Sequence, residues 1–209
     1  KAINATEGGY FDREIVPVEG DLPNGDKEMV MVDEGIRFDA SAESLSGLNV
    51  LSEDGVLTAG TSSQICDGAA AIMIVNDAGL KKLGTKPRAK IIALALAGDD
   101  PVIMLTGPIP ASKNVLNKAD LSIEDIDLYE VNEAFAPVPL AWAHELGADL
   151  EKLNVNGGAM ALGHPLGGTG AKLMTTLLHE LERREARYGL QAICEGGGTA
   201  NAMIIERLS

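Results

Sequence analysis

The sequence predicts an α/β fold: a mixed, mostly parallel five-stranded sheet covered by helices, with part of a loop-rich subdomain attached. Apolar runs of strand length alternate with helical segments in the order βαβαβαββ. Capping residues and glycines separate these segments. Residues 1–62 lack this pattern, so we expect two parts, a loop-rich remnant at 1–62 and the main domain at 63–209.

The first part is expected to be irregular, because glycine and proline recur along it. Residues 14–18 are a candidate short strand, and residues 41–48 a candidate for one or two helical turns. Too little periodic apolar sequence is present for a core of its own.

Apolar runs mark the first two expected strands of the main domain. The run at 69–75 is continuous, which is typical of a strand buried on both faces. The remaining strands are expected at 89–97, 128–131, 191–194 and 200–206.

The expected helices lie between these runs and end at recognisable signals. Gly84 and Gly147 each follow a helical segment, as C-terminal glycines do. Ser122 and Asp125 have the spacing of a capping box. The helices are expected at 77–83, 110–119, 133–146 and about 170–184.

Composition limits the class of protein. The 209 residues are 45% hydrophobic but 3% aromatic, so the core must be aliphatic and closely packed. A net charge of −14 argues against a nucleic-acid partner. No apolar run approaches the roughly 20 residues that span a bilayer, so we expect no membrane association. The acidic residues are scattered, which is typical of a cytosolic surface, so we expect a cytoplasmic location. The chain begins with Lys1, and we interpret it as part of something longer.

His164 is the first candidate for chemistry. It lies in a glycine-rich string at 154–170, between Gly163 and Pro165 and just before an expected helix. Proline restricts the preceding residue to an extended conformation, which fixes the direction of the imidazole. The alternative, a histidine with only a structural role, is nearly as common.

Cys194 is the second candidate, because it ends an apolar strand and precedes three glycines. Functional sites of α/β sheets collect at strand ends, and the Gly196 amide can donate to a developing oxyanion. A buried structural cysteine is the plainer alternative. The other cysteine, Cys66, lies in a polar stretch, and we interpret it as structural.

Asn132 follows the expected strand at 128–131, where it can cap a helix or hold a water or a carbonyl. His144 and His179 have no convergent partners and receive no role. No metal site is expected, because no ligand spacing fits zinc. The glycine string matches neither a P-loop nor a dinucleotide-binding fingerprint.

Taken together, these strings resemble the C-terminal motifs of the thiolases, the acetyl-CoA acyltransferases and acetyltransferases. The resemblance covers essentially the whole chain, with further support from Leu-Thr-Ala-Gly-Thr-Ser-Ser-Gln at 57–64, Asp-Gly-Ala-Ala-Ala at 67–71 and Gly-Pro-Ile-Pro-Ala at 107–111. The motifs themselves are Asn-Glu-Ala-Phe-Ala at 132–136, Asn-Gly-Gly-Ala at 156–159 with Gly-His-Pro-Leu-Gly at 163–167, and Cys-Glu-Gly-Gly-Gly at 194–198.

The resemblance implies a thiolase-like layered fold and a division of labour. Thiolases cleave a 3-ketoacyl-CoA with CoA, or run the reverse Claisen condensation. His164 looks like the base that activates a nucleophilic cysteine and also like the donor to the thioester enolate, beside a water held by Asn132. Cys194 looks like the proton-shuttling cysteine, and Gly196 like an oxyanion-hole donor. Ser63 is similar to a serine that contacts the pantetheine arm of CoA.

Two departures from the family pattern stand out. The usual Ala-Ser pair after Gly167 is Gly168-Thr169, which is a mild change. The larger departure is that the N-terminal thiolase half, with the acyl-carrying cysteine, is missing from this chain. The resemblance therefore implies that residues 1–62 are a remnant of the loop domain and 63–209 the thiolase C-terminal domain, unable to complete the reaction alone.

The resemblance further implies acyl-CoA and CoA as substrates, no cofactor, and a homodimer or homotetramer. The string at 61–64 is closer to the degradative thiolases of fatty acid β-oxidation, and so to lipid metabolism. Two alternatives remain: a ketoacyl-synthase-like condensing enzyme, against which Cys194 argues, and a non-catalytic CoA-binding or dimerisation module.

Overall fold

The structure, a computed structural model, describes residues 1–208. Its main sheet has the strand order β3-β6-β5-β4, where β3 is Ala89–Gly98, β4 Leu128–Val131, β5 Tyr188–Glu195 and β6 Thr199–Arg207. Strand β6 is antiparallel to both neighbours, whereas β4 and β5 are parallel. Three of the four strands therefore run in one direction, which confirms a mixed sheet, although two of its three strand pairs are antiparallel.

The prediction of five strands was wrong, because residues 69–75 form no strand. Ile72, Met73 and Ile74 are 43%, 76% and 66% exposed. An apolar run becomes a buried strand only if strands on either side bond to its backbone. No strand among residues 1–208 does so here.

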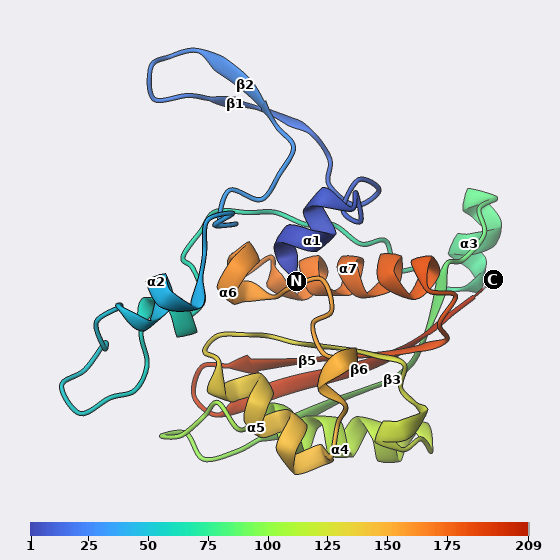
Figure 1. The fold of residues 1–209 in the computed structure, drawn as a ribbon. Coiled ribbons are helices and arrows are strands. Elements are labelled where there is room, and N and C mark those ends of the chain that lie inside the picture. Colours follow the sequence, from blue (N-terminus) through green and yellow to red (C-terminus); the bar gives the residue numbers. More distant parts are fainter. Residues whose placement is uncertain (209) are drawn as a thin grey trace.

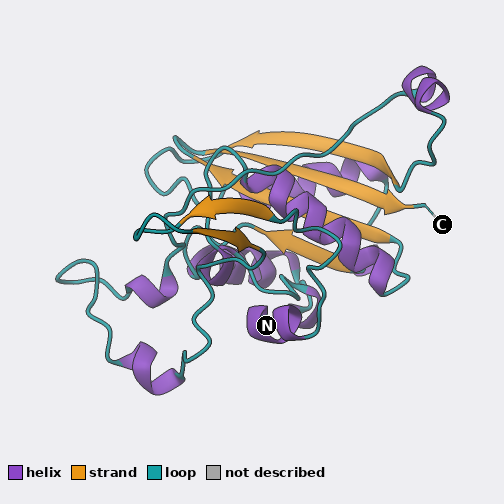
Figure 2. Cartoon of the chain, turned by 90° about the horizontal axis from the view of Figure 1, so that it is seen from above, coloured by secondary structure: helices purple, strands orange, loops and turns teal. Residues whose placement is uncertain are grey.

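Helices cover both faces of the sheet (Figures 1 and 2). Helices α4 (Pro108–Ala119) and α5 (Pro137–Leu146) lie on one face, over a core that includes Trp142, Tyr129 and Ile204. On the other face, α7 (Thr169–Arg183) packs Leu177 and Leu181 against the strands. The expected helix at about 170–184 is thus confirmed.

Local signals fixed several helix ends correctly. Helix α3 (Asp77–Leu83) begins at Asn76, whose side chain accepts from the Gly79 amide, and ends at the left-handed Gly84. The capping box of Ser122 and Asp125 opens a 3-10 turn, η2 (Ile123–Asp125).

The expected helix at 133–146 begins four residues later than predicted, at Pro137. The reason is tertiary: Ala134 and Ala136 hydrogen-bond through their backbones to Ser63 and Thr61. Those bonds hold the segment extended, and proline then suits the first helical position.

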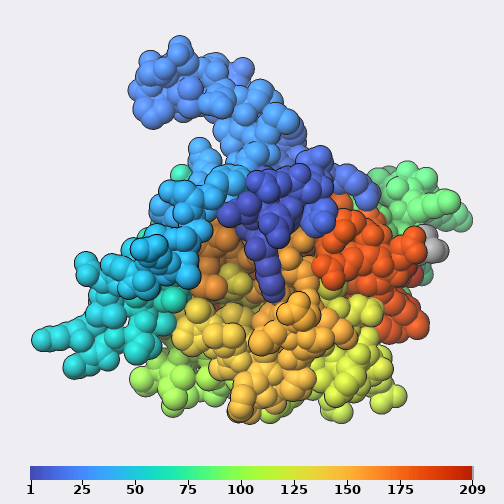
Figure 3. Space-filling model, viewed as in Figure 1, coloured from blue at the N-terminus to red at the C-terminus, as the bar shows by residue number. Residues whose placement is uncertain are grey.

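The first part of the chain is more structured than expected. It holds α1 (Ala2–Glu7), a hairpin of β1 (Val18–Asp21) and β2 (Lys27–Val30), α2 (Ala42–Ser46) and the 3-10 turn η1 (Ala59–Thr61). Of the predicted strand at 14–18, only Val18 lies in a strand, as the first residue of β1. The hairpin projects from the body in Figure 3, whereas α1 packs in a small core with Phe11, Ile36 and Leu162.

Two short elements complete the chain, the 3-10 turn η3 (Leu150–Lys152) and α6 (Ala159–Leu162). Among the helices of residues 1–208, none is both long and apolar enough to cross a bilayer.

Candidate active site

Asn132 and His164 meet at the end of strand β4. The Asn132 amide continues the sheet by donating to the Ala192 carbonyl at 3.0 Å. Its side chain is 1% exposed, and Nδ2 lies 3.3 Å from His164 Nε2. The structure therefore brings together two of the residues predicted from the sequence, from segments 32 positions apart.

The backbone around His164 is held from two sides. Gly163 ends α6 with a φ of +83°, a conformation that favours glycine. The His164 amide then donates to the Gln64 carbonyl at 3.0 Å. A fixed backbone followed by proline leaves the imidazole little freedom of direction.

The Thr169 hydroxyl fixes the proton on the imidazole. Thr169 Oγ1 donates to the Pro165 carbonyl at 2.9 Å and lies 2.6 Å from His164 Nδ1. A hydroxyl has one proton, so toward His164 it accepts, and Nδ1 carries the N–H. Nε2 is then an unprotonated acceptor facing the Asn132 amide. Burial also lowers the pKa of His164, which favours this neutral base.

Asn132 keeps one acceptor for a bound molecule. Within residues 1–208, its buried Oδ1 has no hydrogen-bond partner. Buried amide oxygens normally accept a hydrogen bond, so this atom suits a donor from substrate or water beside His164.

Cys194 lies at the same edge of the sheet. Because β4 and β5 are parallel, Asn132 and Cys194 both stand at carboxyl ends of strands. Burial raises the pKa of the Cys194 thiol, although its own backbone hydrogen bond opposes this, so it holds its proton at neutral pH. Within residues 1–208, no hydrogen bond joins Cys194 to Asn132 or His164.

Gly196 begins the turn between β5 and β6. Its N–H donates to no backbone or side-chain acceptor in the described chain, so it can bind a ligand oxygen. The turn itself requires glycine at 198, where φ is +81° and a Cβ would lie 2.6 Å from the Asp99 carbonyl oxygen.

Ser63 lies in the segment 61–64, here called the strip, which runs between the chain after Asn132 and the loop that carries His164. Its amide donates to the Ala134 carbonyl at 2.9 Å. The neighbouring Gln64 side chain donates to the Gly35 and Met160 carbonyls. The strip therefore connects the segment after Asn132 to the loop that carries His164.

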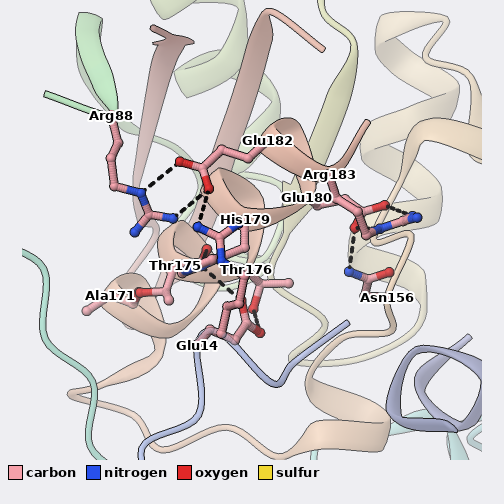
Figure 4. Close-up of polar contacts among 11 residues, drawn as sticks. Glu14, Arg88, Asn156, Ala171, Thr175, Thr176, His179, Glu180, Glu182 and Arg183 are labelled. Carbon is pink, nitrogen blue, oxygen red and sulfur yellow. Dashed lines mark hydrogen bonds and ion pairs between the residues drawn. The ribbon is translucent and has the colours of Figure 1, made fainter. Parts of the chain in front are cut away.

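Helix α7 anchors the glycine string from the other side (Figure 4). Asn156 donates to Glu180 Oε2 at 3.1 Å, and Glu180 also binds Arg183 and Arg184. Burial alone would raise the pKa of Glu180, but these hydrogen bonds bring it below its ordinary value.

The remaining candidates take no part in this site. His179 donates to the Thr175 carbonyl and faces Glu14, while His144 is exposed on α5. Cys66 is a free thiol whose Sγ packs against Gly163. No three of the described His, Cys, Asp and Glu side chains are grouped so that they could hold a metal ion.

Sequence reasoning missed three residues that shape the site: Thr169, Glu133 and Asn154. Thr169 stands five positions after His164, at the start of a helix, which was the one signal of its role. Glu133 directly follows Asn132 and bonds to Asn154, a contact that no local pattern announces.

Comparison with known proteins places these motifs in context. Family models described as "Thiolase, N-terminal domain" and "Thiolase, C-terminal domain" match residues 1–78 and 85–207. A steroid 3-ketoacyl-CoA thiolase, FadA6 of Mycobacterium tuberculosis, is 53% identical over 208 residues, covering 100% of this chain and 50% of that protein. An acetyl-CoA acetyltransferase of Allochromatium vinosum is 46% identical, covering 100% and 53%.

Solved structures agree with the sequence matches. The Bacillus anthracis acetyl-CoA acetyltransferase superposes with a TM-score of 0.94 at 44% identity, covering 99% of this chain and 52% of that one. Human mitochondrial 3-ketoacyl-CoA thiolase in complex with CoA gives 0.90 at 42% identity, covering 99% and 51%. The chain spans about half the length of the relatives it matches.

Proposed function

The chain belongs to the thiolase family, and from this premise we propose that it supplies the acid–base and oxyanion-binding half of an acyltransferase site. The reaction is thiolytic cleavage of a 3-ketoacyl-CoA by CoA, or the reverse condensation. The observation that carries the proposal is the contact of Asn132 Nδ2 with His164 Nε2 at 3.3 Å, with the proton held on the far nitrogen.

In cleavage, His164 Nε2 takes the proton of a nucleophilic thiol, which attacks the 3-keto carbon. The bond between C2 and C3 breaks, leaving an acyl-thioester on the enzyme and the enolate of acetyl-CoA. The imidazolium N–H donates to the enolate oxygen, and Asn132 Oδ1 orients a water beside it. The buried Cys194 thiol then protonates the enolate carbon.

The second half restores His164, Cys194 and the nucleophile to their starting protonation states. The Cys194 thiolate takes the proton of an incoming CoA thiol, which attacks the acyl-enzyme. The Gly196 N–H stabilises the oxyanion that forms. The nucleophile leaves as a thiolate and recovers its proton from His164, while Ser63 contacts the pantetheine arm of CoA.

The nucleophile itself lies outside this chain. Cys194 is assigned to proton transfer, and Cys66 packs against Gly163. Because the chain spans about half of its relatives' length, we assign the acyl-carrying cysteine to an N-terminal thiolase half. Exposed apolar side chains at 69–75 support a partner element there.

Coenzyme A enters as a substrate, and the roles above need no metal or redox cofactor. We further propose a homodimer or homotetramer, since the outer edge of β3 bonds to no strand among residues 1–208. The scattered acidic residues support a cytoplasmic location.

Variants of the full-length protein test this function. His164→Ala and Cys194→Ala should each lower kcat for thiolysis by about 10²-fold or more, since each removes an acid–base group. His144→Ala, an exposed histidine on α5, is the matched control and should keep full turnover. Retention of full thiolysis by both site variants would instead favour a non-catalytic CoA-binding module.

A further inference from the structure

We propose that Glu133 is a positioning residue: its carboxylate ties the chain beside Asn132 to α6, the helical turn that precedes His164, and so sets the contact between Asn132 and His164. This inference rests on the proposed function for its effect on turnover. Its structural part, the separation of Asn132 and His164, can be measured without any activity.

Two donors converge on the Glu133 carboxylate. Oε1 accepts from Asn154 Nδ2 at 2.9 Å, and Oε2 accepts from the Met160 amide at 3.2 Å. Both donors belong to the glycine string: Asn154 is its first residue, and Met160 lies six positions further along it. The carboxylate of the residue after Asn132 is thus bonded to two points of that string.

The Asn154 donor is itself rigid. Its side chain is 2% exposed, and it bonds both Val131 backbone groups at 2.9 Å, donating to the carbonyl and accepting from the amide. Asn154 therefore acts as a neighbouring strand for the last residue of β4. Just beyond the end of β4, Glu133 adds one more hydrogen bond to the same Asn154 side chain.

The Met160 amide belongs to the helical turn that directly precedes Gly163 and His164. Met160 is the second residue of α6, a single helical turn followed by Gly163 and His164. The first N–H groups of a helix have no partner within it, and Glu133 accepts one of them. Because α6 directly precedes Gly163 and His164, a shift of this turn moves His164. The His164 amide also donates to the Gln64 carbonyl.

Gly158 leaves space for the carboxylate. A Cβ at this position would lie 2.3 Å from Glu133 Cδ. No real Cβ comes so close, so any larger residue would displace Glu133 from its two donors. The position of Glu133 therefore depends on Gly158. A substitution of Gly158 displaces the Glu133 carboxylate without removing its charge.

A carboxylate is the group that this geometry requires. It accepts at both oxygens, whereas the glutamine amide would place an NH₂ group against either Asn154 or Met160. One of the two bonds would become a contact between donors. A rigid supporting residue of this kind typically holds a reacting group to within about 0.5 Å.

The test uses Glu133→Gln in the full-length protein. We expect kcat for thiolysis to fall by about 10- to 100-fold, the cost of a misplacement near 1 Å, with KM for CoA changed by less than about twofold because no CoA contact is lost. In a crystal structure of the variant, the separation of Asn132 Nδ2 and His164 Nε2 should exceed hydrogen-bond range. Glu151→Gln, an exposed glutamate on η3, is the matched control and should change neither quantity.

Gly158→Ala gives a second route should the first variant not fold. It should reproduce the loss, and the double variant should be no worse than the more impaired single one, because both act through one contact. The proposal is overturned if the two atoms stay within hydrogen-bond range in both single variants, whatever the activity. A wild-type protein without thiolysis would defeat the proposed function, while the crystallographic distance would still decide the role of Glu133.

Discussion

The protonation of His164 depends on one hydroxyl. Because Thr169 Oγ1 donates to Pro165, it accepts the Nδ1 proton, and it can accept from both the neutral and the protonated imidazole. His164 can therefore gain and lose a proton at Nε2 without turning its ring. Among residues 1–208, no carboxylate is bonded to the His164 ring, so no such partner raises its pKa.

Thr169→Val should remove this control while keeping the shape of the side chain. We expect kcat/KM to fall by about 10- to 100-fold, because the wrong tautomer becomes populated. Thr169→Ser keeps the hydroxyl and should stay within a few-fold of wild type. Thr175→Val removes a similar hydroxyl that donates to the Ala171 carbonyl on α7, and it serves as the control. Equal activity of the Val and Ser variants would contradict the role of Thr169.

The pH dependence of thiolysis follows from two opposite shifts. Burial lowers the pKa of His164, so its base form persists below the ordinary value of 6.5. Burial raises the pKa of Cys194, so its acid form persists above the ordinary value of 9.0. A pH profile of kcat/KM should thus keep its plateau from below 6.5 to above 9 where these two groups limit the rate. An acid limb above pH 6.5 that disappears in His164→Ala would contradict this account.

Some of the site could be predicted from local sequence, and some could not. His164 stands between glycine and proline, and Asn132 ends an apolar run, so both were marked by their neighbours. Thr169, Glu133 and Asn154 act only through contacts between distant segments. Their residue types are common on helix ends and turns, where a capping role would explain them equally well.

At the level of elements, sequence prediction succeeded where the signals were local. The bounds of α3 and β4 were predicted correctly, because capping residues or a short apolar run define them. It failed at 69–75, which is apolar as a buried strand would be but pairs with no strand of the described chain. Strand pairing is a property of two segments, and among residues 1–208 no second segment pairs with this one.

The segment 69–75 should therefore become protected in the full-length protein. We expect its amides to exchange slowly with deuterium there, because bonded neighbouring strands remove N–H groups from solvent. Hydrogen-exchange mass spectrometry measures this directly, and the projecting tip of the β1–β2 hairpin is a fast-exchanging internal reference. Exchange at 69–75 as fast as at that tip would contradict a partner strand.

At the scale of the whole molecule, one face of the sheet is complete and the other is not. The alternate residues Ala93, Ala95 and Ala97 of β3 pack toward the core under α4. Leu94 and Leu96 point to the opposite face, which α7 covers only in part, and they are 51% and 70% exposed. An aliphatic face of this kind is stabilised by burial, so it fits an element contributed by the remaining half.

The proposed reaction requires an active site that is divided between two halves of the protein. Its most direct test is to quench the full-length protein during turnover of a 3-ketoacyl-CoA and to locate the acyl group by peptide mass spectrometry. We predict an acyl-thioester on a cysteine outside residues 1–209, with Cys66 and Cys194 unmodified. An acyl group on Cys66 or Cys194, or full thiolysis by the 209-residue chain alone, would contradict the account.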